Sequence, residues 1–122
     1  MRYLVTAKRS RDWWVLQAVD APGAISQVED LDGAEAIAAE AISFVTEKPA
    51  DEIQVAIVVV PGAFEISVAR DGKFWMVSIP AVDGLTQART RDEVKRVAAE
   101  YIAVTLDTPV SEVTIAPGWD VS

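Results

Sequence analysis

The sequence predicts an α+β fold built from two β-β-β-α-β repeats that associate as a pseudo-twofold pair. The chain of 122 residues repeats its own pattern in its second half. Each half contains short β-forming runs followed by one segment of helical period. A composition of 51% hydrophobic and 25% charged residues is typical of a globular protein.

The two halves align over nearly their whole length. An offset of 61 residues places Trp13 on Phe74, and after the loss of one residue the offset becomes 60. Further aligned pairs are Trp14 with Trp75, Gly23 with Gly84, Ala38 with Ala98, and Pro49 with Pro109. We therefore expect repeats over residues 1–60 and 64–122, joined by a short linker over 61–63. Because repeats of about 60 residues are marginal alone, we expect the two to pair.

The strands come first in each repeat. Runs rich in β-branched and aromatic residues, bounded by polar turns, predict strands. In the first repeat they cover residues 3–8, 13–18, 24–28 and 53–60. In the second repeat the first strand begins at 64, and the others cover residues 74–79, 85–88 and 113–117. Ser10–Asp12 and the dipeptide Asp71-Gly72 predict the hairpin turns.

One helix precedes the fourth strand of each repeat. Thr90 and Glu93 form a predicted capping box, whereas Asp30 is the predicted N-cap of the first helix. Pro49 and Pro109 are expected to end the helices. The mostly apolar stripes expected to face the sheets are Ala34, Ile37, Ala38, Ala41, Ile42 and Val45, and Val94, Val97, Ala98, Tyr101, Ile102 and Thr105. A right-handed crossover predicts the strand order 3-2-1-4.

Side chains alternate between the two faces of a strand, and this assigns each aromatic residue a role. The predicted structural core positions are Trp14, Trp75, Gly23 and Gly84. The opposite face has no helix of its own and predicts partner binding or self-association. Its residues are Trp13, Val15, Phe74 and Met76. Either the two repeats pack these faces on each other or an external partner covers them.

Composition excludes several classes of function. With no cysteine and no histidine, the chain has no disulfide, no Cys/His zinc site and no cysteine nucleophile or Ser-His pair. A net charge of −8 argues against nucleic-acid binding, because phosphate contacts require clustered Lys and Arg. No apolar run has the length of a signal peptide or a membrane span. We therefore expect a cytoplasmic protein without a cofactor.

The pattern resembles the HicB antitoxin family. The second repeat matches through Trp75–Pro80, Gly84, Thr86-Gln87, Thr90 with Glu93, and Ala98–Ile102. The first repeat matches through Trp14, Pro22-Gly23, Ser26-Gln27 and Ala38–Ile42. The resemblance implies a partial RNase H-like fold and a non-enzymatic protein that masks a small basic RNA-cleaving toxin of the HicA type. Family members often add a DNA-binding domain, which we do not expect in these 122 residues.

Two alternatives stay open. One is an orphan self-assembling module that works as a homo-oligomer without a toxin. The other is a degenerate RNase H-like nuclease, which would need carboxylates converging on two metal ions. Its candidate carboxylates are Asp32, Glu40, Asp92 and Glu100, with the loop residues Asp20 and Asp83. The core-facing positions of the first strands carry no acidic residue, so we predict that the protein is not an enzyme.

Overall fold

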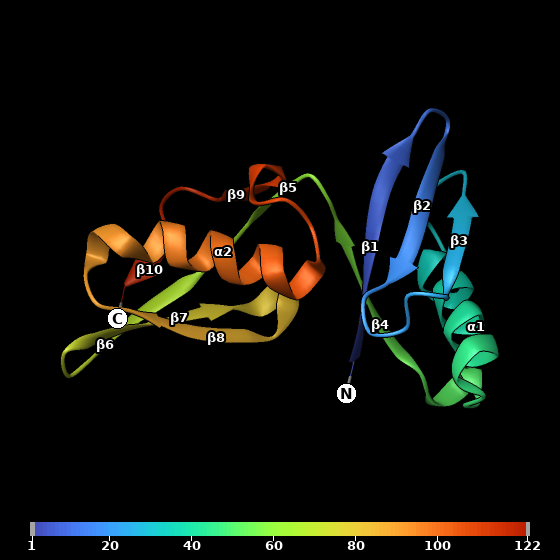
Figure 1. Ribbon diagram of the computed structural model, residues 1–122, viewed down its shortest axis with the longest axis horizontal. Coiled ribbons are helices and arrows are strands. Elements are labelled where there is room, and N and C mark those ends of the chain that lie inside the picture. The colour runs from blue at the N-terminus through green and yellow to red at the C-terminus, as the bar shows by residue number, and fades with distance from the viewer. Residues whose placement is uncertain (1, 122) are drawn as a thin grey trace. The chain divides into compact units, whose positions relative to one another are not determined.

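The computed structural model describes residues 2–121, a mixed α+β chain with several sheets and two helices. The chain divides into two compact units at the boundary between Val60 and Pro61. Figure 1 shows the elements of both units. Gly62 and Ala63, which we expected in the linker 61–63, belong to a strand of the second unit.

The first unit contains one mixed four-stranded sheet and one long helix. Its strands are β1 (Arg2–Ser10), β2 (Trp13–Ala18), β3 (Ile25–Val28) and β4 (Gln54–Val59), with helix α1 (Ala34–Thr46) and the 3-10 turn η1 (Ala50–Glu52). The sheet order is β3-β2-β1-β4, which confirms the predicted local order. β1 and β2 form an antiparallel hairpin, and β4 returns parallel to β1.

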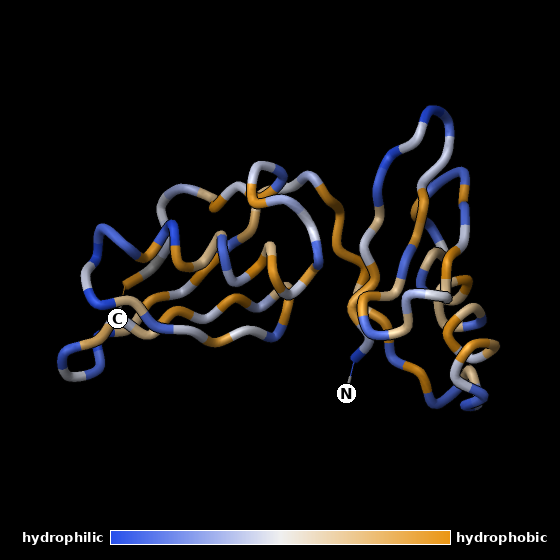
Figure 2. The backbone as a smooth tube through the Cα atoms, viewed as in Figure 1, coloured by the Kyte–Doolittle hydropathy of each residue, from blue (hydrophilic) through white to orange (hydrophobic). Residues whose placement is uncertain are grey.

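The core of the first unit lies between this sheet and α1. Alternate residues of β1 and β2, such as Val5 and Leu16, are buried beneath the helix residues Ala38 and Ile42. Figure 2 shows hydrophobic residues concentrated along the strands, with hydrophilic residues at the tips of the hairpins. The alternation read from the sequence therefore assigns the faces of β1 and β2 correctly.

The second unit contains one four-stranded sheet, a two-stranded parallel pair and one long helix. Its strands are β5 (Gly62–Phe64), β6 (Ser67–Asp71), β7 (Phe74–Ile79), β8 (Gly84–Ala88), β9 (Val113–Ile115) and β10 (Asp120–Val121). Helix α2 (Val94–Leu106) is accompanied by the 3-10 turns η2 (Pro80–Val82), η3 (Arg91–Glu93) and η4 (Val110–Glu112). The larger sheet has the order β10-β6-β7-β8, and β5 pairs with β9.

The parallel pairing in the second unit is interrupted, which the sequence analysis did not predict. Phe64 is aligned with Ile115, and Ser67 is aligned with Asp120. The three steps from Phe64 to Ser67 therefore face five steps from Ile115 to Asp120, so the segment 116–119 bulges out of the ladder. The predicted last strand over 113–117 is accordingly too long, and a further strand, β10, follows the bulge.

The helix ends differ from the prediction. The Thr90 hydroxyl makes no capping bond, and the Glu93 carboxylate accepts the backbone N–H of Arg89 at 3.3 Å. The capping box fails because η3 separates Thr90 from the first residue of α2. In the first unit Asp30 accepts the backbone N–H of Asp32 at 2.9 Å, and the N-cap is Gly33.

Left-handed residues, not the prolines, end both helices. Glu47 after α1 has φ 62° and Asp107 after α2 has φ 52°. The backbone N–H of Glu47 is bonded to the Ser43 carbonyl oxygen at 2.8 Å, as in a left-handed C-cap. Pro49 and Pro109 lie beyond these caps.

Helix α1 buries a narrower stripe than predicted. Ala34, Ala38 and Ile42 are buried, whereas Ile37 and Val45 are exposed. Residues four positions apart lie close to one another on the same side of a helix. One narrow row of such side chains is therefore enough to fill the space above a small sheet. Ile37 and Val45 therefore lie outside the core of the first unit.

Candidate functional site

The first candidate face lies on the side of the first sheet opposite α1. Trp13 and Val15 alternate with the core residues Trp14 and Leu16, so they lie on this side. The Trp13 side chain is 42% exposed, and Val15 is half-buried. An aromatic ring on this face provides a large apolar contact area for a partner.

The second unit presents a similar face opposite α2. Phe74 is 41% exposed and Met76 is half-buried, and both alternate with the buried Val77. Strand β7 thus carries an aromatic and an aliphatic side chain in the same order as β2. The structure brings together Trp13 with Val15, and Phe74 with Met76, on one strand each.

Two further residues extend these faces, and the sequence analysis did not identify them. Ile25 of β3 is 55% exposed, and Leu85 of β8 is 59% exposed. Val15 is aligned with Gln27, which places Ile25 diagonally next to Val15. Leu85 lies diagonally next to Met76 by the same relation through Gln87. The alternation of side chains within the third strands could have identified Ile25 and Leu85. These strands are too short, however, for their side chains to be assigned to a sheet face without the register against the second strands.

We define the two faces by these residues. Face 1 consists of Trp13, Val15 and Ile25 on the first sheet. Face 2 consists of Phe74, Met76 and Leu85 on the second sheet. Each face is one oblique row of apolar side chains across two neighbouring strands.

The second tryptophan of the first pair supports the structure from the helix side. Trp14 packs against the buried core of its unit and is half-buried. The Arg9 guanidinium lies 5.3 Å from the centre of the Trp14 ring. Trp75 has the same arrangement, with Arg70 at 5.0 Å. Both tryptophans thus face the predicted side, with a guanidinium covering the ring.

Of the two glycines predicted as core positions, only Gly84 is buried. A Cβ atom at Gly84 would lie 2.5 Å from Cε1 of Tyr101, so α2 approaches the strand closely there. Gly23 is exposed, and a Cβ atom there would lie 3.8 Å from the nearest atom, in Val45. The prediction for Gly23 is therefore wrong, because no side chain packs closely on its backbone.

The candidate catalytic carboxylates are dispersed. Glu100 forms an ion pair with Arg96 one helical turn away, at 3.2 Å. Glu40, Asp32 and Asp92 are exposed. Within residues 2–121, no group of three or more acidic side chains is arranged to hold a metal ion.

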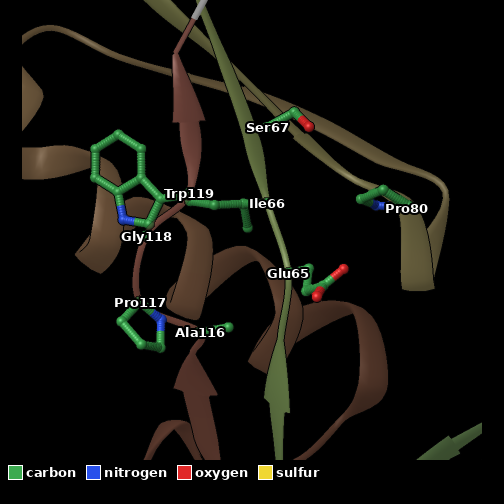
Figure 3. Close-up of a pocket in the computed structure, with 8 residues that line it drawn as sticks. All are labelled: Glu65, Ile66, Ser67, Pro80, Ala116, Pro117, Gly118 and Trp119. Carbon is green, nitrogen blue, oxygen red and sulfur yellow. The ribbon is translucent and has the colours of Figure 1, made fainter.

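A pocket of about 200 Å³ lies in the second unit at the interruption of the parallel ladder. Figure 3 shows the residues that line it, from the segment between β5 and β6, the start of β6 and η2, and from the bulge between β9 and β10. They are Glu65, Ile66, Ser67, Pro80, Ala116, Pro117, Gly118 and Trp119. The repeat pattern of the sequence does not reveal this pocket, because β1 and β4 of the first unit pair without such an interruption.

Helix α1 carries a second exposed apolar surface. Phe44 is 88% exposed, Ile37 lies two turns before it on the same side of the helix, and the exposed Val45 borders this side one position further along. We refer to Ile37, Phe44 and Val45 as the α1 surface. This surface is separate from face 1, because α1 covers the opposite side of the sheet.

Comparison with known proteins gives no relative. No protein-family model, no curated protein and no solved structure matches the chain. Of the two long helices described, neither has the length and apolar character needed to cross a bilayer.

Proposed function

We propose that this protein is a non-enzymatic, cytoplasmic binding protein of the HicB type that masks a small basic RNA-cleaving toxin. The proposal depends above all on faces 1 and 2, where exposed aromatic and aliphatic side chains lie on sheet surfaces without a helix. Contact surfaces of this kind place a few large apolar side chains at their centre. The lack of histidine and cysteine supports a role in recognition instead of catalysis.

Charge supports a basic partner. Residues 1–60 contain ten acidic and five basic side chains, and residues 61–122 contain nine acidic and six basic ones. Both halves are therefore net acidic, so each attracts a basic protein over a distance. Occlusion of a nuclease requires only that the bound protein covers the surface on which RNA lies.

The fold proposal is that each unit is one copy of a duplicated, partial RNase H-like module and that the copies form a pseudo-twofold pair. Two observations support it. The strand-helix-strand order recurs in both units, and Trp13 and Phe74 occupy the same place on corresponding strands. A pseudo-twofold pair predicts inter-unit nuclear Overhauser effects in the intact chain, and their complete absence would contradict it.

The function is tested by reconstitution. Affinity purification from the native cell extract identifies the partner, which is then expressed and assayed for RNA cleavage. We expect one equivalent of the wild-type protein to abolish cleavage, and Trp13→Glu and Phe74→Glu to lose most of this inhibition. Ala36→Glu, at an exposed position of α1 on the other side of the sheet, is the matched charge control. A partner that does not cleave RNA, or inhibition that survives both aromatic substitutions, would reject the proposal.

A second candidate function is self-assembly without a toxin, and the α1 surface favours it. A phenylalanine at 88% exposure, next to the exposed Ile37, forms an apolar patch that is well suited to a helix-helix contact. Ala41, between Ile37 and Val45 on this side, is small enough to let a second helix approach closely.

Analytical ultracentrifugation separates the two candidates. Self-assembly through α1 predicts that the wild-type chain is an oligomer and that Phe44→Glu converts it to a monomer. Val104→Glu, at an exposed position of α2, is the control. A wild-type chain that stays monomeric at high micromolar concentration would reject self-assembly, and toxin binding would then be the remaining candidate.

A further inference from the structure

We infer that the pocket in the second unit accepts an arginine side chain of the basic protein that covers face 2. The inference rests on the proposed function only in the identity of that protein, because the pocket itself can be probed directly. Beyond the proposed function, this contact is between opposite charges. It depends on a ladder interruption that occurs in the second unit but not between β1 and β4 of the first.

The pocket exists because two residues are added to one strand. In the first unit β1 and β4 stay in register from Arg2 to Ala7 without a break. In the second unit the segment 116–119 leaves the ladder between Ile115 and Asp120. Pro117 and Gly118 suit this excursion, because proline cannot donate to a ladder and Gly118 has φ 72°. The pocket is therefore a consequence of the sequence of this segment, and the continuous pairing of β1 with β4 contains no such interruption.

The charged side chain in the pocket lining is an acceptor, and three of the eight lining residues offer no free backbone N–H. Pro80 and Pro117 have no N–H group, and the Ala116 N–H is already bonded to the Phe64 carbonyl oxygen at 2.8 Å. The Glu65 carboxylate is exposed and makes no hydrogen bond or ion pair with any described residue. A ligand with several N–H donors and a positive charge matches the Glu65 carboxylate.

Arginine fits this chemistry better than lysine. Its planar guanidinium donates two parallel hydrogen bonds to one carboxylate, and its weaker hydration lowers the cost of entering a partly enclosed site. Glu65 supplies the carboxylate, and Ser67, two residues along the same side of the strand, supplies a hydroxyl. In Figure 3 both side chains extend on the same side of the strand as Pro80.

The pocket adjoins face 2. Ser67 is aligned with Ser78, and Ser78 is aligned with Leu85, in antiparallel pairs. Directly opposed residues share a sheet face, so this row leads from the pocket to Leu85. A protein that packs on Phe74, Met76 and Leu85 therefore has the pocket at the edge of its contact surface.

The source of the arginine follows from charge. The chain carries 19 acidic and 11 basic residues, and Glu65 adds its charge to an acidic surface. The Arg91 guanidinium lies over the Trp119 ring, 5.1 Å from its centre. A basic partner is therefore the matched occupant, and its arginine would fix the orientation of binding.

The experiment is a titration of the full chain followed by 1H-15N nuclear magnetic resonance. The probe is N-acetyl-arginine methylamide, and the matched neutral control is N-acetyl-citrulline methylamide. We expect saturable shifts confined to residues 65–67 and 116–119 with the arginine probe, and affinity at least about fivefold weaker for citrulline. Equal binding of citrulline, or shifts spread over the acidic surface, would overturn the inference.

Two variants localise the effect. Glu65→Gln keeps the size of the side chain and removes its charge, so the arginine probe should bind about fivefold more weakly. Asp71→Asn removes one charge from the other end of β6 and should leave binding unchanged. The dispersion of each spectrum reports whether the variant is folded. Wild-type affinity in Glu65→Gln, or an equal loss in Asp71→Asn, would reject a specific pocket.

The outcome is separable from that of the proposed function. If the probe binds at Glu65 but the purified partner is no RNA-cleaving protein, only the toxin proposal fails. If toxin inhibition is intact and the probe does not bind, only the arginine pocket fails.

Discussion

Trp13 and Trp14 are neighbours in the chain and have opposite surroundings. Trp14 packs on the core with Arg9 over its ring, whereas Trp13 is exposed on face 1. This difference follows from the twofold period of a strand, and the sequence alone was enough to predict it. Phe74 and Trp75 show the same contrast on β7.

The contrast predicts different costs of truncation. Trp14→Ala should lower the free energy of unfolding by about 3 kcal/mol, because the ring fills space beside the core. Trp13→Ala should lower it by about 1 kcal/mol or less, since its ring is partly hydrated already. Urea denaturation measures both values. Equal destabilisation by the two substitutions would show that the face assignment is wrong.

Gly84 shows that an aligned glycine in two repeats does not reveal whether a helix side chain packs against it. Gly23 and Gly84 align in the two halves, yet only Gly84 meets a helix side chain, that of Tyr101. In the first unit Ala41 takes the place of this tyrosine, so no ring presses on Gly23. The alignment could not reveal the difference, because it depends on a side chain from a distant element.

The two glycines should therefore respond differently to the same change. Gly84→Ala should cost about 1–3 kcal/mol, because the new methyl group displaces the Tyr101 ring. Gly23→Ala should be neutral within about 0.5 kcal/mol. The double variant Gly84→Ala with Tyr101→Leu should recover part of the loss. Thermal denaturation tests all three, and a neutral Gly84→Ala would contradict the close approach.

At the scale of elements, strands were easier to predict than helix ends. β2 and β7 match the predicted ranges 13–18 and 74–79, since alternation and turn residues agree there. The ladder interruption was missed because Pro117 and Gly118 are ordinary signals for the end of a strand. Nothing in the local sequence showed that pairing resumes at Asp120.

Both helices end with a non-glycine residue in the left-handed region, and this predicts a stabilising change. Glu47→Gly and Asp107→Gly should each raise the free energy of unfolding by about 0.5–1 kcal/mol, because glycine adopts positive φ without strain. Glu35→Gly, in the first turn of α1, is the opposite control and should destabilise. Thermal denaturation measures the change, and lower stability in both C-cap variants would contradict the cap geometry.

At the scale of the whole molecule, the mixed α+β class could be predicted from the order in which strand-like and helix-like hydrophobic periods occur along the chain. The extent of faces 1 and 2 did not, because it depends on strand register. Charge is the other whole-molecule property available from the sequence, and −8 on 122 residues produces a long-range field.

This field predicts the salt dependence of partner binding. The association rate constant with a basic toxin should fall at least about tenfold between about 0.05 and 0.5 M salt. The dissociation rate constant should change much less, since the apolar contacts of faces 1 and 2 govern it. Stopped-flow mixing measures the first and surface plasmon resonance the second. An association rate independent of salt would exclude electrostatic steering.

The distribution of guanidinium groups has a practical consequence for spectroscopy. Trp14, Trp75 and Trp119 each have an arginine over the ring, and Trp13 is the exposed indole. Burial of Trp13 by a bound protein would shift its emission to shorter wavelength, while Trp14 and Trp75, on the helix side of their sheets, provide a steady background. The chain thus carries a native optical reporter of occupancy, and Trp13→Phe would silence it while retaining an aromatic ring.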